Sequence, residues 1–144
     1  MTPGFDPPGF SATGGSETTL AEIDERLGFN HHRRRLVQGL RRAIRNLKAA
    51  GVQRVWVDGS FVTSKPKPGD VDGCWDPTGV DPAQLDPVLL DFDNSGAAMK
   101  ARYGVDFFPN VVEGASGKVF YRFFQYDRNQ HRRGILLLKP GGEE

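Results

Sequence analysis

Apolar residues recur at helical spacing in two segments of the first third of the chain. Thr19 followed by Glu22 forms a capping box, which predicts that a helix begins there. Ile23 and Leu27 are four residues apart and share its buried face. Gly28 is a suitable residue to follow the last turn. The first segment is therefore expected to be a short amphipathic helix.

The second segment is longer and strongly basic on its polar side. Asn30 is placed to cap it, and Gly51 ends it after about Ala50. Its apolar positions form one stripe at helical spacing: Leu36, Val37, Leu40, Ala43, Ile44 and Leu47. A long helix with a single inward face is expected.

Strand-like runs follow. Residues 54–57 are a short β-type run that leads into Asp58-Gly59-Ser60, and residues 70–75 alternate in a way typical of a second strand. The proline-rich loop between them makes the pair a hairpin-like unit with a long connection, and Gly73 predicts a bulge in its second strand. Residues 105–108 and 134–138 are expected to be further strands.

The remaining segments predict more helices. Asp81-Pro82 is a cap followed by a proline suited to a first helical turn, in a helix interrupted near Pro87. Residues 95–103 are expected to be helical, with Gly104 behind them, and the aromatic residues 119–126 fit either helix or strand. The mixture predicts an α/β (α+β) fold with a small mixed sheet flanked by helices.

Length and composition indicate one domain. We expect a flexible Gly/Pro-rich arm over residues 1–17, a single domain over residues 18–140 and a short tail over residues 141–144. The formal net charge of +1 gives no global attraction to nucleic acid or membrane. One cysteine excludes an internal disulfide. No apolar run suits a membrane helix and no secretory signal is visible, so a cytoplasmic location is expected.

The chemistry is concentrated between Val57 and Trp75. On a strand, Asp70 and Asp72 project from the same face, where two unpaired carboxylates repel each other. A divalent cation relieves that repulsion, and oxygen ligands favour Mg²⁺ or Mn²⁺, which usually also bind substrate phosphates.

The turn before this pair is suited to phosphate. Gly59 allows the backbone to approach a ligand closely, and the amides that follow, with the Ser60 hydroxyl, are available as donors. Lys65 and Lys67 lie in the connecting loop, where either one can neutralise a triphosphate.

This arrangement resembles the signature of the DNA polymerase β-like nucleotidyltransferase superfamily: glycine, then Gly or Ser, then a spacer, then Asp-x-Asp or Asp-x-Glu. Here Gly59-Ser60 is followed by nine residues and then Asp70-Val71-Asp72. The superfamily takes a third carboxylate from a later strand, and Asp106 is the best match. The resemblance implies that Asp70 and Asp72 bind metal and triphosphate. It implies that Asp106 binds the catalytic metal or activates the attacking hydroxyl.

A narrower resemblance covers nearly the whole chain. The motifs GFN, VWVDGSF, YGVDFF, FFQYDRN and RGILLL look like those of a small, uncharacterised family of bacterial nucleotidyltransferase-like proteins. Members of that wider group are often implicated in toxin–antitoxin or phage-defence systems. The expected activity is transfer of a nucleotidyl group from a nucleoside triphosphate to a hydroxyl of a protein, an RNA or a small molecule.

Other interpretations remain open at this point. The same fold with weak or no turnover would be a partner-binding, antitoxin-like module. The chain would instead be an RNA-binding protein if the basic helix is the functional surface, although a solvated helix face is the simpler interpretation. That basic cluster comprises His31, His32, Arg33, Arg34 and Arg35, continued by Arg41, Arg42, Arg45 and Lys48.

Several residues near the motif have structural interpretations. Asp58 is expected to bond nearby backbone in the turn rather than join the site. Asp91 and Asp93 compete with Asp106 as the third carboxylate, but helix capping is preferred for Asp93. Cys74 is expected to be a small buried strand residue rather than a catalytic thiol. The aromatic residues of segment 119–126 are expected to belong to the core.

Overall fold

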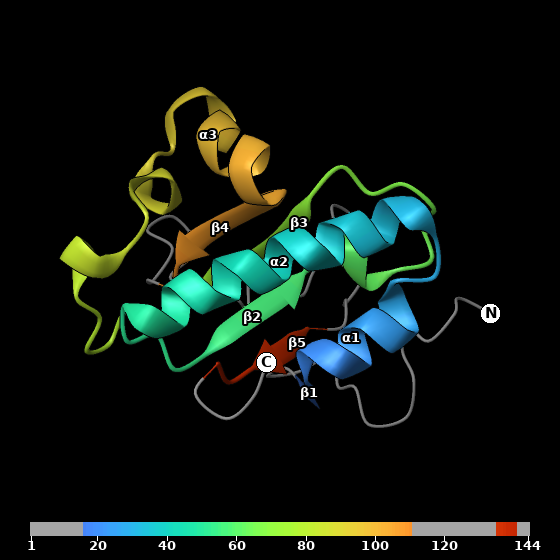
Figure 1. The fold of residues 1–144 in the computed structure, drawn as a ribbon, viewed down its shortest axis with the longest axis horizontal. Coiled ribbons are helices and arrows are strands. Elements are labelled where there is room, and N and C mark those ends of the chain that lie inside the picture. Colours follow the sequence, from blue (N-terminus) through green and yellow to red (C-terminus); the bar gives the residue numbers. More distant parts are fainter. Residues whose placement is uncertain (1–15, 111–134, 141–144) are drawn as a thin grey trace, which may run out of the picture.

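The computed structural model describes residues 16–110 and 135–140, which form a mixed sheet with helices (Figure 1). Its five strands lie in the order β1-β5-β2-β3-β4. They are β1 Ser16–Glu17, β2 Val55–Asp58, β3 Val71–Trp75, β4 Val105–Pro109 and β5 Leu136–Leu138. Strand β2 pairs antiparallel with β3 and β5, whereas β3–β4 and β1–β5 are parallel. The predicted mixed α/β class is confirmed.

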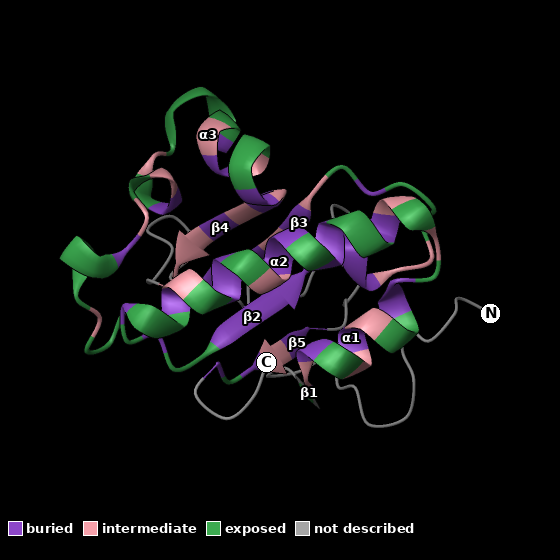
Figure 2. Ribbon diagram, viewed as in Figure 1, coloured by how far each residue is buried: buried purple, intermediate pink, exposed green. Residues whose placement is uncertain are grey.

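Two helices cover one face of the sheet (Figure 1). In α1, Leu20–Leu27, the Thr19 side chain accepts a hydrogen bond from the Glu22 amide, as the capping box predicts. In α2, His31–Ala49, Asn30 accepts from the Arg33 amide. The predicted apolar stripes are the buried faces of both helices (Figure 2).

The sheet is buried on both faces along β2. Val55 and Val57 belong to the large core cluster beneath the helices, whereas Trp56 packs with Cys74 and Ile135 on the opposite face. All four residues of β2 are buried, which explains why β2 reads as an apolar run. Its last residue, Asp58, is the only charged residue of β2.

The helices between β3 and β4 in the chain differ from those that were expected. Asp81 and Asp86 each cap a short 3₁₀ helix, Pro82–Gln84 and Pro87–Leu90, so no interrupted α-helix forms there. Helix α3, Asp93–Tyr103, contains three successive residues in the left-handed region, Asn94–Gly96. Regular helix therefore begins only after Gly96, and it ends at Gly104, which has φ +69°.

Two further expectations change. Ser16 and Glu17, assigned to the arm, form β1 and pair in parallel with Leu136 and Leu137. Gly73 produces no bulge, because β3 keeps an unbroken register with β2 and β4. A Cβ at Gly73 would collide with the Trp56 carbonyl, so the glycine permits close strand contact instead. Within the described ranges, no helix is long and apolar enough to cross a membrane.

Candidate metal and phosphate site

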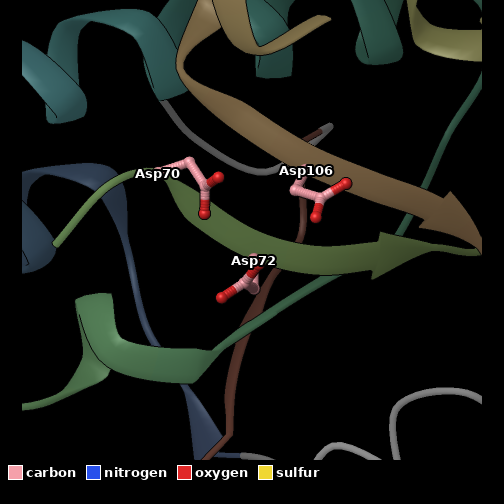
Figure 3. A group of neighbouring side chains, drawn as sticks. All are labelled: Asp70, Asp72 and Asp106. Carbon is pink, nitrogen blue, oxygen red and sulfur yellow. The ribbon is translucent and has the colours of Figure 1, made fainter. Parts of the chain in front are cut away.

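Three carboxylates converge where β3 and β4 begin (Figure 3). Asp70 directly precedes β3, Asp72 is the second residue of β3, and Asp106 is the second residue of β4. Asp72 and Asp106 are register partners on adjacent parallel strands, so their side chains share one face of the sheet. One oxygen from each of the three residues lies within 4.8 Å of the others. The structure thus brings together the three aspartates singled out from the sequence.

The rival third carboxylates lie outside this cluster. The Asp91 side chain accepts a hydrogen bond from the Asp93 amide at 3.0 Å, so the local capping role falls to Asp91 rather than to Asp93. Asp93 is exposed at the first residue of α3. Asp106 is therefore the aspartate that completes the group.

The cluster is short of positive charge. Burial, followed by repulsion from Asp70 and Asp106, raises the pKa of Asp72 to about 7, and Lys100 only partly opposes this. Burial is also the largest cause of the raised pKa of Asp106. Oδ1 of Asp106 is buried and has no hydrogen-bond partner among the described residues. A buried carboxylate oxygen without a partner is costly unless a cation or donor reaches it.

Lys100 on α3 is a functional candidate that the sequence reasoning missed. Its Nζ lies 3.8 Å from Oδ2 of Asp70 and 3.7 Å from Oδ2 of Asp106. The available signal was its position as a lone cation among the small and apolar residues Gly96–Ala101, a few residues before the strand that carries Asp106. One ammonium group thus bridges two of the three carboxylates.

Gly59 brings the turn after β2 against the carboxylates. The residue has φ +82° and begins the 3₁₀ turn Gly59–Val62, which also contains Ser60. A Cβ at this position would collide with Oδ2 of Asp72, so only glycine allows this approach. The predicted pairing of a glycine turn with the acidic strand is present in the fold.

The loop that joins the turn to β3 is fastened to the start of α2 by Arg33. The guanidinium donates to four backbone carbonyls: Leu27 at 2.9 Å, Phe61 at 2.9 Å, Thr63 at 2.6 Å and Lys65 at 3.0 Å. It also lies over the rings of Phe29 and Phe61. Burial lowers the pKa of Arg33 to about 10, so the group is still charged at neutral pH.

Arg33 therefore does not belong to a solvated helix face or to an RNA-binding surface. Two neighbours extend its role, because Asn30 donates to the Pro66 carbonyl at 2.8 Å and a ring nitrogen of His32 lies 2.6 Å from the Pro68 carbonyl. The start of α2 thus fixes the path of the loop between Gly59 and Asp70. The side chain of Lys65 is exposed in this loop, and its predicted phosphate contact stays a prediction.

Asp58 differs from its expected role. Its side chain does not cap the turn that follows, and the residue is 2% exposed. It is the register partner of Asp72 on the neighbouring antiparallel strand, so both side chains lie on the same sheet face. Burial, followed by the charge of Asp58, raises the pKa of the Cys74 thiol, in agreement with an inert buried cysteine. The aromatic segment 119–126 lies outside the described residues.

Residues 3–139 match the model of a family of unknown function, DUF6932, and the chain belongs to that family. No curated protein and no solved structure matches the chain.

Proposed function

We propose that this protein is a divalent-metal-dependent nucleotidyltransferase. It would transfer a nucleotidyl group from a nucleoside triphosphate to a hydroxyl of an RNA, a protein or a small molecule. The observation that carries the proposal is the convergence of Asp70, Asp72 and Asp106 within 4.8 Å, beside a glycine turn that contacts Asp72. The spacing of the turn and the acidic pair in the sequence supports the same activity.

The residues present fit Mg²⁺ or Mn²⁺. All three ligands offer hard carboxylate oxygens, which these ions prefer. Burial and mutual repulsion together raise the pKa of Asp72, and the buried Oδ1 of Asp106 lacks a hydrogen-bond partner among the described residues. Both features favour a bound cation. Asp70, Asp72 and Asp106 would hold the metal, which supplies Lewis-acid stabilisation of negative charge on the phosphates.

The protein's own groups account for the remaining requirements of the reaction. The acceptor oxygen bonds to the α-phosphorus while the bond from that phosphorus to the bridging oxygen breaks and pyrophosphate leaves. The hydroxyl proton passes to a carboxylate, and we assign this role to Asp106, the third carboxylate of the cluster, on the strand beside Asp72. Backbone amides of the Gly59–Val62 turn would donate to the triphosphate, and Arg33 holds the loop behind that turn in place.

Calorimetric titration tests the proposal directly. The wild-type protein is titrated with each of the four ribonucleoside triphosphates in the presence of Mg²⁺, beside Asp72→Ala and the matched variant Asp93→Ala. Asp93 is exposed and lies outside the cluster, so its loss controls for removal of one negative charge. The proposal expects metal-dependent binding of a nucleotide that Asp72→Ala abolishes and Asp93→Ala retains. Binding of no nucleotide by folded wild-type protein, or equal binding by both variants, contradicts it.

A further inference from the structure

A large groove runs between α2 and α3, next to the carboxylate cluster. Its volume is about 460 Å³, and five basic side chains line it: His32, Arg35, Arg42, Lys100 and Arg102. No acidic residue is among the described residues that line it. The groove is therefore suited to a polyanion.

The cations on the α2 wall follow one stripe of the helix. Arg35 and Arg42 are seven residues apart, which places them on the same side of α2, about 10 Å apart along its axis. No salt bridge within the described ranges neutralises either one, although Arg42 donates to the Arg102 carbonyl at 3.0 Å. On the α3 wall, Arg102 is already paired with Asp86 at 2.9 Å. Arg35 and Arg42 thus provide the charge available to a ligand.

The groove meets the carboxylate cluster at Lys100, whose ammonium lies 3.7 Å from Asp106 and 3.8 Å from Asp70. The Gly59 turn follows β2, on the other side of β3 from β4 in the strand order. The turn and the groove thus contact the cluster at different residues: the turn lies against Asp72, and the groove reaches Asp70 and Asp106 through Lys100. A triphosphate held at the turn leaves Asp106, which Lys100 contacts, for the acceptor.

We propose that the groove between α2 and α3 binds the phosphodiester backbone of a single-stranded nucleic acid whose terminal hydroxyl is the acceptor of nucleotidyl transfer. This inference rests on the proposed function and names its acceptor class. Arg35 and Arg42 contact successive phosphates, and Lys100 guides the end of the strand to Asp106. Recognition is independent of base sequence, because the groove presents charge and offers one largely buried aromatic residue, Tyr103, for stacking.

Fluorescence anisotropy with labelled single strands of about 12 nucleotides, one RNA and one DNA of the same sequence, tests the groove. The test variant is Arg35→Gln/Arg42→Gln. The control is Arg34→Gln/Arg41→Gln, which removes the same charge at the same seven-residue spacing on α2 from residues that do not line the groove. Each pair also includes one arginine bonded to a backbone carbonyl, Arg42 to Arg102 and Arg34 to Gly28. Thermal melting verifies that both variants are folded.

We expect the groove variant to bind RNA about tenfold more weakly than wild type, and the control to change less than about threefold. Two lost phosphate contacts should also reduce the slope of log affinity against log salt by about 1.4. The RNA and DNA arms show which strand is preferred. If both variants bind the strands equally more weakly than wild type, the effect comes from general surface charge, and the proposal is overturned.

Two outcomes separate failure of the groove from failure of the proposed function. Wild-type protein that binds a nucleoside triphosphate with Mg²⁺ but no single strand overturns the groove proposal and leaves the metal site intact. If Arg35→Gln/Arg42→Gln loses triphosphate binding instead of strand binding, the groove is a donor site and the acceptor assignment is wrong.

Discussion

The backbone of Gly59 lies so close to the carboxylate of Asp72 that a Cβ at position 59 would collide with Oδ2. This contact joins the end of β2 to the middle of the acidic cluster. The position of the turn therefore depends on the position of the Asp72 carboxylate, and a substitution at either residue should displace the other.

Gly59→Ala should therefore weaken both folding and metal binding. The positive φ of +82° costs about 1 kcal/mol in alanine, and the collision with Asp72 adds to that. Gly79→Ala is the matched control, because Gly79 has φ +72° and nothing lies within 4 Å of its Cβ position. Urea unfolding and Mn²⁺ titration should show a larger loss for Gly59→Ala in both measurements. Equal Mn²⁺ affinity of the two variants would show that the contact does not shape the site.

Asp72→Asn should stabilise the metal-free protein at alkaline pH. The folded-state pKa of Asp72 is raised to about 7, above its unfolded value, so its contribution to stability is fully present below pH about 4 and is lost as pH rises through 7. Asparagine removes that loss and should raise the free energy of unfolding at pH 8 by about 1–2 kcal/mol, with no gain near pH 4.

Chemical denaturation in the presence of a chelator measures this difference, with Asp93→Asn as an exposed control for the same chemical change. A stability gain of the same size at both pH values would mean that ionisation of Asp72 is not its source.

Arg33→Lys should be strongly destabilising despite keeping the charge. A lysine ammonium cannot donate to all four carbonyls that the guanidinium binds, and it would be buried with incomplete partners. We expect a loss of about 3 kcal/mol in the free energy of unfolding. Arg34→Lys, at an exposed position with one bond of 3.3 Å, should change it by less than about 0.5 kcal/mol. Comparable values for the two variants would refute the structural role of Arg33.

Lys100→Met should increase the affinity for Mn²⁺ in the absence of nucleotide. The ammonium lies 3.7–3.8 Å from two of the proposed ligands and competes with an incoming cation for them. Isothermal titration with Mn²⁺ should show binding several-fold tighter than wild type. Weaker binding by Lys100→Met would indicate that the lysine organises the carboxylates for the metal instead of competing with it.

The local parts of this fold could be predicted from the sequence because their signals are local. Thr19 and Asn30 cap the helices as expected, and the alternation around Asp72 predicts its strand. The 3₁₀ helices after Asp81 and Asp86 were predicted as one interrupted α-helix, since a capping aspartate before proline suits either form.

Only those site residues that are identified by their separation or local pattern along the chain could be predicted from the sequence. Asp70 and Asp72 share a face because they are two residues apart on extended chain, and Asp106 was recognised by its place in an apolar strand. Asp58 and Lys100 depend on strand order and helix placement, which spacing along the chain does not reveal. Arg33 was grouped with exposed neighbours because its burial arises from a loop about 30 residues later.

Direct detection of bound Mn²⁺ by electron paramagnetic resonance tests the metal site at the centre of this account. Wild-type protein should bind Mn²⁺ saturably, Asp72→Asn should lose that binding, and Asp93→Asn should retain it, because only Asp72 belongs to the three-carboxylate cluster. Absence of Mn²⁺ binding by folded wild-type protein, or the same affinity in Asp72→Asn, would contradict the account.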